Sequence, residues 1–173
     1  MTKYFGAKSL VFIGALFLVG TLHISPVLAQ EPVPEKEDGT DLEFMQIQKK
    51  YIEDYAEKDG FIIRPGGMLV KRLRAGTGKS PAKTDVVVVN YSGMLADGIV
   101  FDSSYARNRP ETFEVGGVIK GWTQALLLMR EGSKWEIIIP STLGYGVTGS
   151  PPVIPPYAVL HFTVELVAIQ GQK

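Results

Sequence analysis

Hydrophobic and polar residues alternate with a period of two over most of the chain from Gly67 onward. This spacing is typical of β-strands, and the segments that show it are rich in β-branched and aromatic residues and end at Gly, Pro, Asp or Ser. They read MLVKRLRAG, DVVVVNYSGML, GIVFDSS, ETFEV, KWEIIIP and AVLHFTVELVAI. The dipeptide Asp97-Gly98 predicts a hairpin turn between the second and third segments.

The last of these segments indicates a sheet with one buried face and one exposed face. Leu160, Phe162 and Val164 alternate with His161 and Thr163, so the apolar side chains share one face. We therefore expect His161 to lie on the solvent side and to take no part in catalysis.

Two segments have a helical period instead. Residues 119–130 carry Trp122, Ala125, Leu126 and Met129 on one stripe, and Gly132 follows the predicted helix. One short helix against an antiparallel sheet is an α+β arrangement.

Residues 42–58 form the second helical segment, and Gly60 follows it as a stop signal. Its apolar residues recur at helical intervals: Phe44, Ile47, Tyr51 and Tyr55. Thr40 and Glu43 stand at capping-box spacing before it. The amphipathic helix has to pack its stripe on the main domain, which we favour, or on the same stripe of a second chain.

The first 29 residues have the pattern of a secretory signal peptide. Lys3 and Lys8 precede an apolar run over residues 10–22, and Val27-Leu28-Ala29 offers a cleavage site after Ala29. An uncleaved membrane anchor is the alternative, but the run is shorter than the ~20 residues of a spanning helix. We expect export to the periplasm, with no stable membrane insertion after cleavage.

The chain then divides into a signal peptide (1–29), a flexible acidic leader (30–41), an amphipathic helix with its connector (42–66) and a folded domain (67–173). The leader, QEPVPEKEDGTD, contains too little apolar surface to offset the entropy of ordering.

The amino-acid composition excludes most kinds of catalysis that depend on cysteine or on several histidines. The chain has no cysteine and 2 histidines, which excludes disulfides, a thiol nucleophile and a cysteine-ligated metal site. We expect no metal and no cofactor. Basic and acidic residues are equal at 18 each, and loss of Lys3 and Lys8 leaves a small acidic excess, so nothing favours binding to nucleic acid.

Several segments together resemble one family. VNYSGMLADGIVFDSS, VIKGWTQALLLMREGSKWEIIIP, LGYG and SPPVIPPYAVLHFTVEL are similar in content, order and spacing to the FKBP-type peptidyl-prolyl cis–trans isomerases, and the chain looks like their Mip-like bacterial branch. The similarity runs from about Gly67 to Ile169. It implies a curved antiparallel sheet of about five strands wrapped around the short helix, with an apolar pocket between them.

The resemblance also implies the site. Trp122 forms the floor of the pocket, and Tyr91, Phe101 and Phe162 form its walls. The full set expected to catalyse is Tyr91, Phe101, Asp102, Trp122, Tyr145 and Phe162, and the residues expected to bind substrate are Glu111, Val118, Ile119, Val153 and Ile154. Tyr145, Asp102 and the backbone N–H of Ile119 are the polar groups in an otherwise apolar pocket.

Two acidic positions leave alternatives. Asp102 either caps the turn through Ser103 and Ser104 or accepts hydrogen bonds at the pocket edge from a phenol such as Tyr91, and the resemblance favours the second. Glu111 stands where single-domain members often carry an aromatic residue, so we expect a more open and more acidic outer wall. The proline-rich loop over residues 150–156 is expected to overhang the site as a stiff flap.

The resulting hypothesis is an isomerase that rotates X–Pro bonds of exported or unfolded proteins without a covalent intermediate. The resemblance adds macrolides as ligands, and the shortened segment before the sheet predicts a monomer or a weak dimer through residues 42–58. The alternative is a chaperone or binding module that holds clients in the same cleft with little turnover.

The signal peptide gives the first testable prediction. Because the basic start, the apolar run and the VLA site agree, the secreted chain should begin at Gln30. Mass spectrometry of a periplasmic fraction measures its N-terminus, and an intact chain that begins at Met1 would contradict the prediction.

Overall fold

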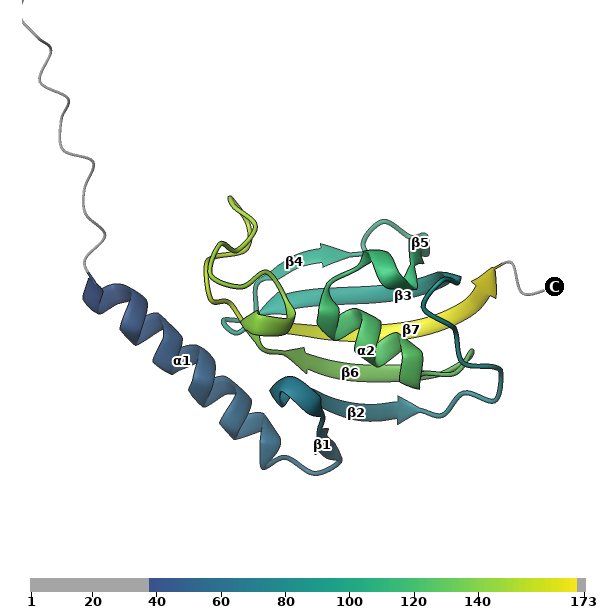
Figure 1. The fold of residues 1–173 in the computed structure, drawn as a ribbon, viewed down its shortest axis with the longest axis horizontal. Helices are drawn as coiled ribbons and strands as arrows, with labels where there is room; N and C mark the ends of the chain where they lie inside the picture. Colours follow the sequence, from purple (N-terminus) through teal and green to yellow (C-terminus); the bar gives the residue numbers. More distant parts are fainter. Residues whose placement is uncertain (1–37, 171–173) are drawn as a thin grey trace, which may run out of the picture. The chain divides into compact units, whose positions relative to one another are not determined.

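The computed structural model describes residues 38–170, so the expected signal peptide and most of the acidic leader lie outside the described residues. Within this range an antiparallel sheet is covered by helices (Figure 1). The predicted α+β class is confirmed. No helix in residues 38–170 is both long enough and apolar enough to cross a membrane.

The sheet has seven strands in the order β1-β2-β6-β7-β3-β4, and β5 pairs with β3. Their bounds are β1 Phe61–Ile63, β2 Leu69–Arg74, β3 Val86–Leu95, β4 Val100–Ser103, β5 Glu111–Glu114, β6 Lys134–Ile139 and β7 Leu160–Gln170. All pairings are antiparallel. The expectation of about five strands was too low, and β1 shows no sequence signal because three residues are too few to reveal an alternation.

The turn predicted at Asp97-Gly98 joins β3 to β4. Gly98 has φ +87°, which glycine adopts without strain. Its N–H donates to the carbonyl of Leu95, and the N–H of Leu95 donates to the carbonyl of Ile99. The hairpin brings Phe101 and Asp102 beside β3.

The short helix α2, Lys120–Leu128, packs on one face of the sheet as predicted (Figure 1). Gly121 permits its close approach, since a Cβ there would lie 2.6 Å from Cγ2 of Ile139. The core beneath the helix joins Trp122, Leu126 and Met129 to apolar residues of β6 and β7. A glycine in the first turn of α2 therefore sets the distance between helix and sheet.

The N-terminal helix α1, Asp38–Ala56, packs on the opposite face of the same sheet. Alternation in β6 separates the two layers, because Ile137 and Ile139 belong to the core under α2 whereas Ile138 packs under α1. Leu69 of β2 and Val159 complete the patch under α1, which contacts it through the following residues: Tyr51, Ile52, Tyr55 and Ala56. The expectation that this helix packs within its own chain is confirmed.

The details of α1 differ from the sequence pattern. The helix begins at Asp38, so Thr40 lies inside it, and the predicted capping box is wrong. Ile47, assigned to the apolar stripe, is 55% exposed, whereas Gln48 is buried and its Oε1 accepts a hydrogen bond from the N–H of Val159 at 2.9 Å. The buried amide of Gln48, which binds the backbone of Val159 just before β7, takes the place of the expected apolar contact.

His161 is the clearest correction. It was expected on the solvent side, but it is only 3% exposed because α1 covers that face. Its Nε2 lies 2.7 Å from Oε1 of Glu136, and its Nδ1 lies 2.7 Å from Oη of Tyr51. A carboxylate accepts only, so Nε2 carries the proton. Because burial lowers the pKa of the imidazole, Nδ1 is unprotonated at neutral pH and accepts from the phenol. The imidazole thus links α1 to the sheet in its neutral form.

The burial of His161 predicts a pH-dependent stability. Burial lowers the pKa of its imidazole below the ordinary 6.5, although Glu136 opposes the shift. The unfolded chain then binds a proton more readily than the folded chain as the pH falls through 6.5, so stability present above that pH is lost below it. We expect the free energy of unfolding by urea to fall between about pH 7.5 and about pH 5.5, and to fall less in His161→Gln.

No other imidazole complicates this measurement, since the other histidine, His23, precedes the predicted cleavage site. An equal loss in the parent and in His161→Gln would assign the pH dependence to carboxylates instead.

Candidate functional site

A cavity of about 370 Å³ opens between α2, the hairpin of β3 and β4, and β5. Its walls are mostly aromatic and aliphatic, with polar groups at the edge. The lining residues are Tyr91, Phe101, Asp102, Phe113, Gly117, Val118, Ile119, Trp122, Tyr145 and Phe162. This size and lining are typical of a small-molecule or peptide pocket.

The indole of Trp122 is the centre of the aromatic packing. The rings of Tyr91, Phe113 and Phe162 meet it nearly at right angles, with centroids 5.2, 5.7 and 5.3 Å away. These edge-to-face contacts are a favoured geometry for aromatic pairs. Rings from the three strands β3, β5 and β7 therefore pack around the indole that forms the floor of the cavity.

Gly93 of β3 makes the far wall possible. A Cβ at this position would lie 2.4 Å from Cε1 of Phe162 and 2.7 Å from Cζ of Phe101. Without it, these two rings meet edge to face at 5.5 Å. Sequence reasoning missed Gly93, although an isolated glycine inside a strand pattern is a signal of close approach.

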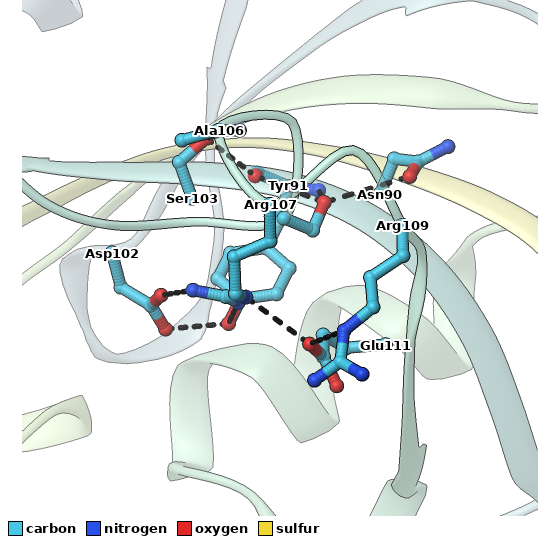
Figure 2. A network of polar contacts seen from close by, with 9 residues as sticks. Asn90, Tyr91, Asp102, Ser103, Ala106, Arg107, Arg109 and Glu111 are labelled. Atoms are coloured by element: carbon cyan, nitrogen blue, oxygen red, sulfur yellow. Dashed lines mark hydrogen bonds and ion pairs between the residues drawn. The ribbon is translucent and has the colours of Figure 1, made fainter.

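The polar side of the cavity is a hydrogen-bonded cluster (Figure 2). Oη of Tyr91 donates to Oδ2 of Asp102 at 2.5 Å, and Nη1 of Arg107 donates to Oδ1 of Asp102 at 2.5 Å. Nη2 of Arg107 also donates to Oη of Tyr91 at 2.9 Å. Sequence reasoning missed Arg107, because an arginine in an exposed loop carries no signal of its own.

These contacts fix the charge states of the cluster. Burial raises the pKa of the Asp102 carboxyl, but hydrogen bonds from Tyr91 and Arg107 outweigh burial, so the pKa lies below its ordinary value. Burial and the hydrogen bond to Asp102 together raise the pKa of Tyr91 to about 12, with Arg107 opposing them. At neutral pH the pair is a carboxylate and a neutral phenol.

The hydroxyl groups of Ser103 and Ser104 tie the loop that follows Asp102, and a hydrogen bond with the backbone of Ser103 helps to lower the pKa of Asp102. Oγ of Ser104 accepts from the N–H of Tyr91 at 2.8 Å, and the N–H of Ser104 donates to the carbonyl of Tyr91 at 2.9 Å. Oγ of Ser103 accepts from the N–H of Ala106 at 3.3 Å. With the loop tied in this way, the carboxylate of Asp102 is left to face the cavity and the phenol.

Most of the residues expected at the site lie together. Those that line the cavity are Tyr91, Phe101, Asp102, Val118, Ile119, Trp122, Tyr145 and Phe162. Val153 and Ile154 do not line it: Val153 is 51% exposed, and Ile154 is buried in the core. The proline-rich loop therefore contributes no side chain to the cavity wall.

The outer wall differs from the expectation of an open, acidic surface. Phe113, two residues after Glu111 on β5, supplies an aromatic side chain to the cavity. Glu111 does not line the cavity; its Oε1 accepts from Nε of Arg107 at 3.1 Å and lies 3.5 Å from Nε of Arg109. The same alternation along ETFEV that suggested a strand could have placed Phe113 beside Glu111.

The described residues contain no group of three or more His, Asp or Glu side chains placed to hold a metal ion. What the cavity offers is an apolar, aromatic space with hydrogen-bonding groups on one side. Such a site can desolvate and orient a ligand.

Comparison with known proteins agrees with this geometry. The family model for FKBP-type peptidyl-prolyl cis-trans isomerases matches residues 77–167. The macrophage infectivity potentiator of Trypanosoma cruzi is 39% identical over 169 residues, which cover 97% of this chain and 85% of that protein. The FKBP-type 22 kDa peptidyl-prolyl cis-trans isomerase of Escherichia coli K12 is 49% identical over 120 residues, which cover 69% of this chain and 58% of that protein.

Among solved structures, FkpA from Escherichia coli superimposes with a TM-score of 0.73 at 38% identity, covering 78% of this chain and 63% of that one. The chain therefore spans only part of the length of these bacterial relatives. The family match nevertheless includes β3 to β6, α2 and every residue that lines the cavity. On this evidence the chain belongs to the family of FKBP-type peptidyl-prolyl cis-trans isomerases.

Proposed function

We propose that this isomerase rotates X–Pro peptide bonds in the cavity floored by Trp122, by desolvation and placed hydrogen bonds and without a covalent intermediate. The observation that carries the proposal is the set of three aromatic rings packed nearly at right angles around Trp122. One of them, the neutral phenol of Tyr91, donates a hydrogen bond to the ionised carboxylate of Asp102.

The reaction needs no nucleophile. Rotation about a peptide bond faces a barrier of ~18–20 kcal/mol, because resonance gives the C–N bond partial double-bond character. That resonance form separates charge, so an apolar surrounding disfavours it relative to the twisted, less polar amide. A gain of about 6 to 8 kcal/mol in the transition state would accelerate the step by more than a factor of ten thousand.

The cavity offers both parts of such a mechanism. The face of Trp122 accepts a pyrrolidine ring, and Phe101, Phe113 and Phe162 exclude water around it. Ile119 immediately precedes α2, where backbone N–H groups have no partner inside the helix, and it can hold the substrate chain together with the phenol of Tyr145.

Asp102 acts by its charge and its hydrogen bonds rather than by proton transfer. Its lowered pKa keeps it ionised at neutral pH, and both its oxygens already accept from protein donors. The carboxylate therefore orients Tyr91 and sets the electrostatic potential at the polar wall, where the substrate carbonyl turns.

Substrates are proline-containing segments of unfolded clients, and macrolides are expected ligands of the same cavity. The predicted export would place the protein where slow proline steps limit the folding of secreted proteins. One relative, from Legionella longbeachae, is named an outer membrane protein MIP. The helix α1 packs Tyr51, Ile52 and Tyr55 against its own chain, which favours a monomer over a weak dimer through residues 42–58.

A holding function in the same cleft is the second candidate. Exposed apolar side chains follow Tyr145 along the loop beside the cavity, with Val147 67% and Val153 51% exposed. They offer unfolded chains an apolar surface next to the catalytic pocket. If the protein only holds clients there, variants with and without isomerase activity should suppress the aggregation of an unfolded client to the same extent.

The floor of the cavity gives a direct test of turnover. Trp122→Leu should lower kcat/KM for a proline tetrapeptide at least about tenfold, because the flat aromatic face is lost. Truncating a buried aromatic also costs stability, of order 3–5 kcal/mol for alanine. Trp135→Leu is the matched control, since Trp135 is equally buried but does not line the cavity. We expect Trp122→Leu and Trp135→Leu to have similar melting temperatures, with activity lost only in Trp122→Leu. Equal activities of the two variants would place the site elsewhere.

The polar wall gives a test with macrolides. Asp102→Asn keeps the shape of the side chain but removes the charge that Arg107 compensates and one oxygen acceptor of the carboxylate that Tyr91 and Arg107 share, so the affinity for a macrolide ligand of the family should fall about tenfold. Titration calorimetry measures it, with Asp97→Asn in the exposed hairpin turn as control. Absence of heat and of any thermal shift in the parent protein at saturating macrolide would count against ligand binding in this cavity.

A further inference from the structure

The guanidinium of Arg107 connects three strands through three different nitrogens (Figure 2). Nη1 donates to Asp102 on β4, Nη2 donates to Tyr91 on β3, and Nε donates to Glu111 on β5. Arg107 itself lies in the loop between β4 and β5. The planar guanidinium has its donors in a fixed arrangement, so three acceptors in three directions define its position.

Two of these acceptors belong to the cavity and the third does not. Asp102 and Tyr91 line the cavity, whereas Glu111 does not line it and is linked to them through Arg107. Only one side chain separates the carboxylate of Glu111 from the polar wall.

Glu111 is itself firmly placed. Its backbone pairs with Val89 of β3, and its side chain is 27% exposed between Arg107 and Arg109. A carboxylate in this position is not available as a free charge for a passing substrate, because two cations compensate it. Its geometric effect on Arg107 is the larger consequence.

We propose that Glu111 is a positioning residue for the isomerase reaction: by holding Nε of Arg107, it fixes the guanidinium that orients Asp102 and Tyr91 at the cavity wall. The proposal rests on the proposed function, in which Asp102 and Tyr91 shape the polar wall. It replaces the expectation that Glu111 acts by making the outer wall more open and more acidic.

Three variants separate geometry from charge. Glu111→Ala removes the acceptor and the charge, and we expect kcat/KM to fall about three- to tenfold, mainly through kcat. Glu111→Gln keeps an oxygen acceptor for Nε and loses only the charge, so it should recover most of that loss. Glu114→Ala removes a glutamate from the same strand that is exposed and does not line the cavity, and is the matched control.

A double-mutant cycle tests whether the effect passes through Arg107. In the Arg107→Ala background, Glu111→Ala should cause no further loss, because the connection is already broken. Peptides with lysine, alanine or glutamate next to the proline should all lose activity to the same extent. A loss that is confined to lysine peptides, that is shared by Glu111→Gln or that persists in the Arg107→Ala background would overturn the proposal in favour of direct charge attraction.

A measurement without substrate separates this proposal from the proposed function. The Nε–H resonance of Arg107 in an NMR spectrum is assigned by its absence in Arg107→Ala. Its proton should exchange slowly with water in the parent and in Glu111→Gln, and rapidly in Glu111→Ala. If exchange is as slow in Glu111→Ala as in the parent, or if its kcat equals that of the parent, Glu111 is no positioning residue, although the parent remains an isomerase. An inactive parent with a slowly exchanging Nε–H would overturn the proposed function and leave the contact intact.

Discussion

The site depends on a steric constraint at one position of the central strand. Gly93 carries no side chain, so Phe101 and Phe162 can meet above it, and Phe162 can then contact Trp122. Any Cβ at Gly93 would collide with both rings. The aromatic cavity is therefore a consequence of packing in β3, its neighbours β4 and β7, and α2, and it cannot be assigned to one loop.

The two faces of the sheet pack against different helices. Residues of β6 and β7 that point toward α2 build the core and the cavity wall, whereas those that point the other way receive α1. Glu136 and His161 are of the second kind, and they bind Tyr51 of α1 through the imidazole. Because strand side chains alternate, the helix that docks on the back lies against the same strands that support the cavity.

The electrostatics of the cavity are local and balanced. Asp102 and Glu111 supply two negative charges, and Arg107 and Arg109 compensate them within one cluster. The cluster keeps Asp102 ionised and Tyr91 neutral, so the polar wall offers a fixed arrangement of donors and acceptors. Fixed dipoles in a site with little water stabilise a changing charge distribution without reorganising. Rotation about an amide bond changes the charge distribution of the amide, because resonance is lost as the bond twists.

The sequence by itself determined the strands β2 to β7, the short helix, the hairpin at Asp97-Gly98 and most of the residues that line the cavity. Alternation and helical spacing are local properties, and the order of several motifs matched a family whose fold brings them together. The amphipathic stripe of α1 also indicated a packing partner. The signal peptide over residues 1–29 remains a prediction from the same kind of pattern.

Only the tertiary structure decided what covers each face and which charges meet. The alternation in β7 placed His161 correctly opposite the core, but it gave no information on whether water or a helix lies on that side. Arg107 and Glu111 are four residues apart but lie in a loop and a strand rather than in a helix, so no local pattern predicts that they pair. Nor does a local pattern predict that Arg107 also pairs with Asp102 and Tyr91. Burial and ion pairing depend on contacts between distant segments, and a linear pattern records only one side of each contact.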